Sequence, residues 1–304
     1  MTRSLSRRTL LTSAAAIPVA AGLPAWAEAP MLGASTPLYN RFMLGAFEVT
    51  TLLVGTASRP DPQTIFGQNV SADEFKAVSD EAFLPTDLVQ FFFTPTVVNT
   101  GKQLVLFDTG LNAEGTTKAL EAAGYAPEMV DVVVITHMHG DHIGGMIANG
   151  SPTFANASYV TGAAEFDTWS KADNALFDSN MRPLAEKTTM INDADSAFSG
   201  HTSVAAFGHT PGHMAHVIES DGEALMIAGD FANHYVWSLA HPDWEVKFDM
   251  DKSAAAATRR ALLGMLASEK MPFVGYHMPW PGTGYVETKD SGFQYVPTSY
   301  QLML

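Results

Sequence analysis

The chain has 304 residues, of which 46% are hydrophobic and 16% charged, a composition typical of a globular protein with a sizeable core. Its formal net charge of −15 and its pI near 4.9 disfavour binding to the phosphate backbone of nucleic acids. The sequence contains no cysteine, which excludes disulfides and thiolate metal sites, so any metal site must use His, Asp or Glu side chains.

The N-terminus has the parts of a bacterial export signal. Arg7 and Arg8 precede an apolar run over residues 10–22, and Ala25-Trp26-Ala27 provides a small-residue cleavage site. The paired arginines resemble a twin-arginine export signal. The apolar run is too short for a good transmembrane span, and an uncleaved interfacial anchor is the alternative to a cleaved leader.

These features predict a twin-arginine signal peptide over residues 1–27 and a single mature domain over residues 28–304. We therefore expect a periplasmic or secreted protein that is handled by the twin-arginine export machinery. After processing it should have no stable membrane span.

The first half of the chain alternates turn-rich segments with predicted strands. Residues 28 to about 45 have little periodicity and are interpreted as an N-terminal arm, and residues 55–86, which are rich in turn formers, as a surface excursion. Strands are predicted at 47–54, 89–99, 103–107 and 130–136, and a short helix at 116–123. The continuous apolar run at 130–136 is typical of a strand buried on both faces.

The second half partly repeats this pattern. Strands are predicted at 158–161, 203–207 and 271–276, a hairpin at 216–219 and 223–228, and helices at 163–171 and 253–270. Strands mixed with helices in two halves predict an α/β (α+β) fold of layered sheets with helices outside.

A histidine-rich motif follows the strand at 132–136. Here His137, His139, Asp141 and His142 place four candidate ligands within six residues. In extended backbone alternate side chains share a face, so His137 and His139 point the same way. Gly140 permits a sharp turn, after which Asp141 and His142 can point at a second position nearby. The spacing predicts two adjacent metal half-sites, and a solvated histidine-rich loop is the alternative.

The pattern His137-x-His139-x-Asp141-His142 resembles the signature of the metallo-β-lactamase superfamily. Further pieces resemble later and earlier motifs of that superfamily, in order: Phe107-Asp108-Thr109-Gly110, Thr210-Pro211-Gly212-His213, Gly229-Asp230 and Tyr276-His277. The resemblance covers about residues 47 to 285. It implies an αββα metallo-β-lactamase sandwich, with two mixed β-sheets flanked by helices and the metals at one sheet edge.

The resemblance also implies the ligands of a binuclear metal centre. The first metal is assigned His137, His139 and His213, the second Asp141, His142 and His277, and Asp230 bridges both. His209 and His216 are alternatives to His213, which is chosen because the Pro-Gly before it matches the family pattern. Asp108 is expected to support a ligand imidazole from behind. Two Zn²⁺ ions are expected, with Mn²⁺, Co²⁺ or Fe²⁺ as alternatives.

Two cations ~3.5–4 Å apart can hold a bridging water and lower its pKa toward ~7. We expect such a bridging hydroxide to attack an ester-type carbon or phosphorus, with Asp230 and Asp141 as the catalytic carboxylates. The chain has no cysteine to supply a thiolate and no Gly-x-Ser-x-Gly elbow, which argues against a protein nucleophile.

Within the superfamily the chain resembles the methyl parathion hydrolase-like group, through Phe91-Phe92-Phe93-Thr94-Pro95 and the segments 207–213 and 276–282. This implies hydrolysis of organophosphate triesters or aryl esters, as by a phosphotriesterase, and a homodimer is consistent with that group. Such small-molecule substrates need a roomy apolar pocket. The candidate walls are Phe92, Phe93, Trp169, Phe177 and Trp280.

The main alternative is a lactonase, for example one that opens acyl-homoserine lactones in quorum quenching. A mononuclear iron dioxygenase and a non-catalytic metal-binding protein are alternatives outside the hydrolases. The complete second set of ligands, Asp141, His142 and His277, favours the two-metal hydrolase over both.

Overall fold

A computed structural model describes residues 30–299 of the chain, so the expected signal peptide lies outside the described residues. Residues 30–36 are exposed and have no regular secondary structure, and a compact unit begins at Pro37. Within the described range, no helix combines the length and the apolar character needed to cross a bilayer.

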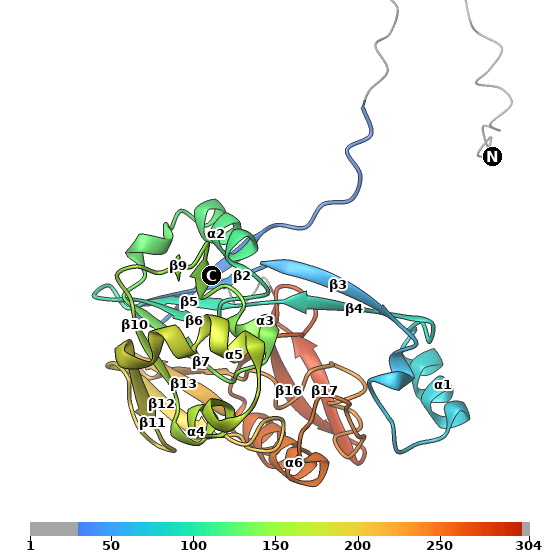
Figure 1. The fold of residues 1–304 in the computed structure, drawn as a ribbon. Helices are drawn as coiled ribbons and strands as arrows, with labels where there is room; N and C mark the ends of the chain where they lie inside the picture. Colours follow the sequence, from blue (N-terminus) through green and yellow to red (C-terminus); the bar gives the residue numbers. More distant parts are fainter. Residues whose placement is uncertain (1–29, 300–304) are drawn as a thin grey trace, which may run out of the picture. The chain divides into compact units, whose positions relative to one another are not determined.

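Two mixed sheets form the centre of this unit (Figure 1). The first has the order β1-β2-β5-β6-β7-β10-β11, and its strands are Tyr39–Leu44, Phe47–Leu52, Thr96–Asn99, Leu104–Phe107, Val132–Ile135, Ser158–Gly162 and Thr188–Ile191. The second runs in sequence order from β12 to β17, and its strands are His201–Ala205, Met214–Ser220, Glu223–Ile227, Phe273–Val274, Thr283–Lys289 and Gly292–Pro297. Two separate hairpins are β3 (Gly55–Pro60) with β4 (Leu88–Phe93), and β8 (Ile147–Ala148) with β9 (Ser151–Pro152).

Between residues 30 and 299, six α-helices accompany these sheets: α1 Ala72–Glu81, α2 Ala113–Ala122, α3 Gly140–Ile143, α4 Ala163–Lys171, α5 Ala175–Asn180 and α6 Lys252–Glu269. Three short 3₁₀ helices cover Pro62–Thr64, Pro127–Met129 and Arg182–Lys187. Side-chain caps fix the starts of four of these helices, where Ser71 (α1), Asn112 (α2), Asn174 (α5) and Asp251 (α6) each accept a hydrogen bond from a backbone amide of the first turn.

The strand β7 shows how the layers form. Its four residues are all buried, as the continuous apolar run predicts. Val132 and Val134 pack into the core between the two sheets, whereas Val133 and Ile135 pack on the other face, in the core that includes Leu120 of α2. Alternate side chains of a strand point to opposite faces, so β7 separates two cores.

The second sheet separates its two cores in the same way. Leu225 and Ile227 of β14 face the core between the sheets, and Met226 packs with Leu263 and Leu266 of α6. The layers therefore run helix, sheet, sheet, helix, with α2 at the top and α6 at the bottom of Figure 1. This confirms the predicted αββα sandwich of two mixed sheets flanked by helices.

The structure differs from the predicted elements mainly near the N-terminus. The segment interpreted as an N-terminal arm contains β1, which pairs antiparallel with β2 from Tyr39 to Leu44. Only Leu44 of this strand is buried, because β1 lies at the edge of its sheet, and its sequence therefore lacks a strong apolar pattern.

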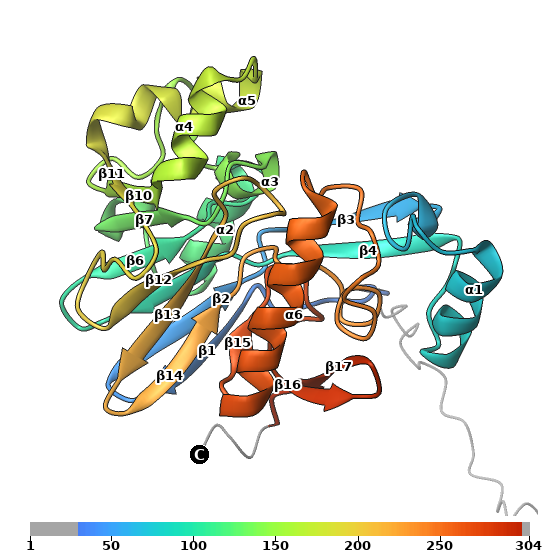
Figure 2. The same ribbon diagram turned by 90° about the horizontal axis from the view of Figure 1, so that it is seen from below.

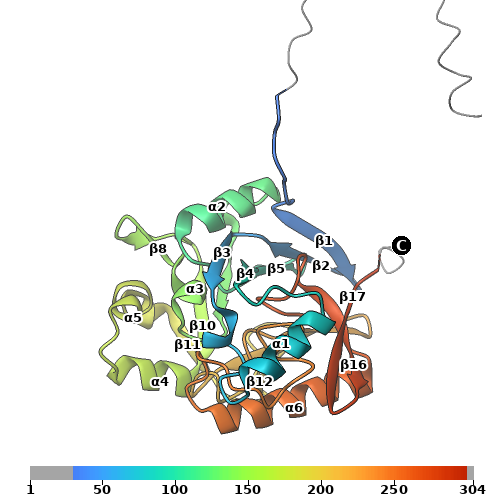
Figure 3. The same ribbon diagram turned by 90° about the vertical axis from the view of Figure 1, so that its right-hand side faces the viewer.

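The predicted strand 89–99 is two strands. The chain breaks at Thr94-Pro95, where β4 ends and β5 begins. Proline has no amide hydrogen for a ladder, so it is disfavoured inside a sheet. As a result β5 joins the first sheet, and β4 pairs with β3 in a hairpin. Figure 2 shows this hairpin leading out of the sheets toward α1, which lies toward the viewer in Figure 3.

Candidate metal centre

The histidine-rich motif lies at the end of β7. After Ile135 and Thr136 the chain stays extended through His139 and then turns into α3 at Gly140. His137 and His139 point together, with His137 Nε2 3.1 Å from His139 Nδ1. The following glycines allow close packing, because a Cβ on Gly145 would lie 2.0 Å from the Thr109 carbonyl oxygen. The turn can therefore sit directly against the Asp108–Leu111 loop.

Loops after three other strands bring further ligands to this turn. His209 lies on the loop between β12 and β13, Asp230 follows β14, and His277 follows β15. The strand β15 consists only of Phe273 and Val274, so His277 lies in the loop that follows a strand of two residues.

Three groups of potential ligands overlap, and within each group the ligand atoms lie within 4.8 Å of one another. They are His137 with His139 and His209, then His137 with His142 and Asp230, then Asp141 with His142 and His277. The residues assigned from sequence to the second metal thus lie together, as do His137 and His139 of the first.

Asp230 occupies the position between the two sets. Its Oδ2 lies 3.1 Å from His277 Nε2 and 3.6 Å from His209 Nε2, and its Oδ1 lies 3.5 Å from His142 Nε2. A carboxylate so placed can bind a cation with each oxygen, which is the role predicted for it.

Two orphaned atoms indicate that this cluster fits metal ions. His142 Nε2 and Asp230 Oδ1 are buried and have no hydrogen-bond partner in the described structure. An unsatisfied buried polar atom costs about 1–3 kcal/mol, and a cation between the ligands would satisfy both atoms. The imidazole and carboxylate donors suit zinc, manganese, cobalt or iron, so the donor set alone leaves the metal open.

The structure places His209, rather than the predicted His213, beside His137 and His139. His213 Nε2 accepts a hydrogen bond from the Asp230 amide at 2.9 Å, so its lone pair is already used. His209 Nε2 points at His139 Nδ1, 3.0 Å away. His216, the other alternative, pairs with His201 at 2.9 Å between β13 and β12 and lies outside all three ligand groups.

Asp108 lies behind a ligand, as predicted. Its Oδ2 is 2.8 Å from His142 Nδ1, and its Oδ1 accepts a hydrogen bond from the Thr136 amide. With Nδ1–H donated to Asp108, the free lone pair of His142 is on Nε2, which faces Asp141 and Asp230. Asp108 itself takes a left-handed conformation, with φ 60°.

Glu165 is a buried residue near the site that sequence reasoning missed. From α4, its Oε1 accepts from the Met138 amide and its Oε2 from the Thr210 hydroxyl and the Gly212 amide. Met138 lies between two ligands and Thr210 follows His209, so this carboxylate ties the two ligand-bearing loops together. Glu165 sits inside a predicted helix with no motif around it, so its role could not be read from spacing.

The imidazoles fall into two electrostatic classes. Burial and the neighbouring His142 lower the pKa of His137 well below its usual value, and burial and His209 lower the pKa of His139 to about 3. Burial also opposes charge on His277, but Asp230 and Asp141 outweigh it and raise its pKa to about 10. Without a metal, a proton on His277 provides the positive charge beside Asp230 and Asp141 that a bound cation would otherwise provide.

A cavity of about 530 Å³ opens onto the cluster and exposes His139, Asp141, Asp230 and His277. Its other walls are mainly apolar and include Phe91, Phe93, Leu111, Leu176 and Phe248. Arg59 is the one lysine or arginine among the residues lining this cavity. The metal centre is therefore accessible at the base of an apolar pocket.

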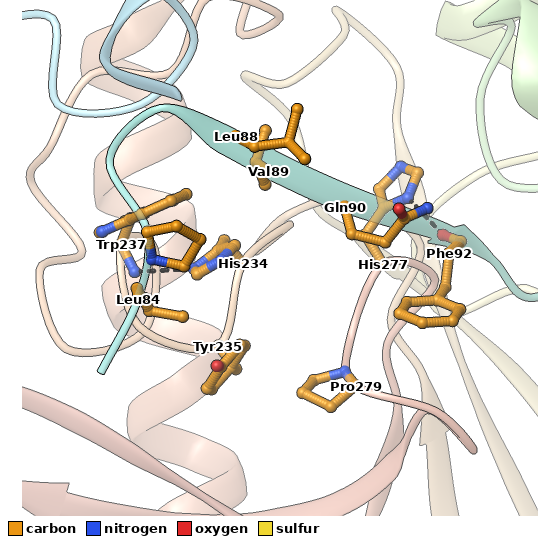
Figure 4. Close-up of a pocket in the computed structure, with 11 residues that line it drawn as sticks. Leu84, Leu88, Val89, Gln90, Phe92, His234, Tyr235, Trp237, His277 and Pro279 are labelled. Carbon is orange, nitrogen blue, oxygen red and sulfur yellow. Dashed lines mark hydrogen bonds between the residues drawn. The ribbon is translucent and has the colours of Figure 1, made fainter. Parts of the chain in front are cut away.

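Only Phe93 of the five predicted pocket walls lines this cavity. Phe92 lies on the opposite face of β4, where it lines a separate cavity of about 300 Å³ with Leu88, Tyr235 and Pro279 (Figure 4). Phe177 is fully buried in the core, Trp169 packs behind His139 with ring centroids 5.9 Å apart, and Trp280 is half-buried outside the cavity. The alternation of β4 explains why Phe91 faces the site and Phe92 does not.

A comparison with protein-family models agrees with this geometry. The model of the metallo-beta-lactamase superfamily matches residues 94–277, which is more than half of the chain and includes every ligand named above. The chain belongs to the metallo-beta-lactamase superfamily. Together with its metal-binding cluster, this makes it a metal-dependent hydrolase.

Solved structures of this superfamily align over nearly their whole length. AidC, a dizinc quorum-quenching lactonase in complex with the product N-hexanoyl-L-homoserine, is 26% identical with a TM-score of 0.80, and the match covers 87% of this chain and 99% of that one. The hydrolase AbOPH is 23% identical with a TM-score of 0.81, covering 88% and 99%, which is a likeness of fold.

Curated relatives match over shorter stretches. An N-acyl homoserine lactonase of Bacillus cereus is 28% identical over 108 residues, covering 36% of this chain and 40% of that protein. Ribonuclease Z of Pyrococcus furiosus is 43% identical over 51 residues, covering 17% and 16%. The chain spans well under half the length of these relatives.

Proposed function

We propose that this protein is a lactonase that opens N-acyl homoserine lactones. The observation that carries the proposal is the apolar cavity of about 530 Å³ whose base is the ligand cluster. A lactone of this kind has an electrophilic ring carbonyl and an apolar acyl chain, which match the base and the walls. The likeness to AidC over 99% of that chain supports the same substrate class.

When bound, two divalent cations would supply a water of lowered pKa and polarise the ring carbonyl. The chain's own groups hold this arrangement. Asp108 keeps His142 in the tautomer whose Nε2 faces the site, and Asp230 stands between the two ligand sets. Asp230 and Asp141 are the carboxylates that line the cavity, and we assign to them the transfer of a proton from the attacking water to the ring oxygen that leaves when the lactone opens.

The cavity walls orient the rest of the substrate. Phe91 and Phe93 are largely buried and give one rigid side, whereas Leu111, Leu176 and Phe248 are 41%, 52% and 41% exposed and surround the entrance. An acyl chain lying against these side chains would be removed from water, at about 25 cal/mol per Å² of apolar surface buried. We therefore expect a preference for longer acyl chains.

A second candidate is hydrolysis of aryl esters or organophosphate triesters. Phe91, Phe93 and Phe248 place three aromatic rings around one apolar cavity, which suits neutral aryl groups. Both reactions need the same pair of metals, so the two activities can coexist in one site.

Export by a twin-arginine signal and a homodimeric state are part of this proposal, on the sequence features given above.

The test is a substrate panel on the purified, metal-loaded protein without residues 1–27. N-hexanoyl-L-homoserine lactone, an aryl phosphotriester and an aryl carboxyl ester are compared, with ring opening followed by mass spectrometry. The proposal expects the highest kcat/KM for the lactone and its loss in His139→Ala. Efficient phosphotriester cleavage without lactone opening would overturn it in favour of the second candidate.

A further inference from the structure

A buried chain of charged groups lies behind His209. Asp249 stands between His209 and Arg259, with Oδ1 2.9 Å from His209 Nδ1 and Oδ2 accepting a hydrogen bond of 2.7 Å from Arg259 Nη2. The three residues are 1%, 5% and 0% exposed, so water does not screen them. A buried ion pair is costly unless its geometry is good and its remaining donors are satisfied.

Asp249 determines which nitrogen of His209 can bind a metal. A carboxylate accepts the proton of Nδ1, which leaves the lone pair on Nε2. That atom faces His139 Nδ1 at 3.0 Å and Asp230 Oδ2 at 3.6 Å. The other oxygen of Asp249 accepts from Arg259, so each carboxylate oxygen has one partner and Oδ1 is held toward His209 Nδ1.

Arg259 also contacts the backbone of the loop that carries Asp230. Its Nε donates to the carbonyl of Phe231 at 2.9 Å, and Phe231 directly follows Asp230. Its Nη1 donates to the Pro242 carbonyl at 2.8 Å. One guanidinium on α6 thus contacts both the partner of a first-site ligand and the loop that carries the bridging carboxylate.

The start of α6 is fixed against the His209 loop by the backbone as well. The Met250 amide donates to the His209 carbonyl, and the Asp251 amide donates to that of Gly208. A Cβ on Gly208 would lie 2.2 Å from the Ala255 amide nitrogen, so α6 and this loop are in close contact. These backbone contacts join α6 to the His209 loop without the Arg259 guanidinium. The charged network is therefore not needed to pack the helix against the loop.

We propose that Arg259 is a positioning residue for both metal sites, acting on His209 through Asp249 and on Asp230 through the Phe231 backbone. An aliphatic side chain of similar volume would fill the same space without the cost of burying charge. The network therefore serves the geometry of the ligands. This inference rests on the metal centre and is independent of which substrate the enzyme opens.

The test measures metal binding rather than turnover. Variants Asp249→Asn, Arg259→Lys and Arg259→Met of the full-length mature protein are stripped of metal and titrated with Co²⁺ against a competing chelator. Their visible absorption, which reports ligand geometry, is recorded at one and two equivalents. Arg260→Met is the matched control, because Arg260 is the next residue of α6 and pairs with Asp243 at the surface.

The expected result is a fall of about 10- to 100-fold in Co²⁺ affinity at the site that contains His209. Asp249→Asn keeps one acceptor for His209 but turns its amide toward Arg259, so the Co²⁺ spectrum should shift while the protein stays folded. Arg259→Lys should recover part of the affinity lost in Arg259→Met, and Arg260→Met should bind as the wild type does.

A second control separates positioning from stability. Leu263→Ala, one turn along α6 in the apolar core, should lower the unfolding temperature and leave Co²⁺ affinity unchanged. If Leu263→Ala loses as much affinity as Arg259→Met, or if Asp249→Asn and Arg259→Lys keep wild-type affinity and spectrum, the proposal is overturned. Loss of lactone opening alone would bear only on the proposed function.

Discussion

His209 and His213 are four residues apart, and each flanks the same Thr-Pro-Gly turn. Their hydrogen bonds differ. His209 is hydrogen-bonded to Asp249 through Nδ1, so its Nε2 is free to face the ligand cluster, whereas His213 Nε2 accepts a hydrogen bond from the Asp230 amide. We therefore expect His213 to hold the Asp230 backbone in place and His209 to be the metal ligand.

This difference predicts opposite outcomes for two substitutions. His209→Ala should lose one of two metal equivalents, and turnover should fall by roughly 10²-fold or more, the scale of losing a group that stabilises the transition state. His213→Gln, whose amide oxygen can still accept from Asp230, should keep both equivalents. Elemental analysis of the purified variants decides the matter, and a metal deficit confined to His213→Gln would restore the original assignment.

The sequence could identify the set of ligands but could not choose between these two histidines. His137, His139, Asp141 and His142 are ordered by a strand and a turn, so their spacing carries geometry. His209 and His213 lie in a loop, where no periodicity exists, and the partner that selects His209 is Asp249, 40 residues away. Only the fold brings that partner into contact.

At the scale of elements, the alternation of side chains along β4 determines which aromatic rings line the metal cavity. Phe91 and Phe93 face the metal cavity, and Phe92 faces the other side with Pro279. Helices with clear patterns were predicted well, and α4 begins and ends at the predicted residues. The break of the predicted strand 89–99 at Pro95 and the edge strand β1 were not, because pairing partners rather than local composition determine them.

The faces of β4 give a matched pair of variants. Phe93→Ala should raise KM for N-hexanoyl-L-homoserine lactone by about tenfold, since losing apolar contact with a substrate costs about 1–3 kcal/mol. Phe92→Ala should leave KM close to the wild-type value. Steady-state kinetics over several acyl chain lengths provides the measurement, and equal effects of both variants would mean that the chain binds elsewhere.

The strands β12 and β13 are linked by a buried histidine pair. His201 and His216 lie 2.9 Å apart, and burial lowers the pKa of His201 to about 4. The unfolded chain binds this proton near pH 6.5, so stability is full above that pH and falls as pH drops toward 4. The thermal midpoint should therefore decline over this range, and more weakly in His201→Asn. Parallel pH curves for the two proteins would contradict this.

At the scale of the whole molecule, the apolar cores are separate from the candidate metal ligands. The three cores consist of apolar side chains, and the ligand cluster lies at the ends of the strands that cross them. The fold should therefore survive without metal, while the ligands contribute stability only when a cation binds the native state.

Metal removal should lower the unfolding temperature without unfolding the protein. At a free metal concentration 100-fold above Kd, each bound ion stabilises by about 2.7 kcal/mol, so removal of two ions corresponds to roughly 10–20 °C for a domain of this size. Calorimetry before and after chelation, with far-ultraviolet circular dichroism at 25 °C, tests this. A random-coil spectrum in the chelated sample would show that the metals are needed for folding.

The shortness of β15 has a consequence for how the cations leave. His137 and His142 follow a strand paired on both sides deep in its sheet, whereas His277 depends on a two-residue ladder. Transient fraying of that ladder would free His277 from one bound ion and leave the ligands of the other ion in place. The two ions should therefore exchange with solvent at different rates, the one beside His277 first, and a half-loaded protein should accumulate on the way to the empty one.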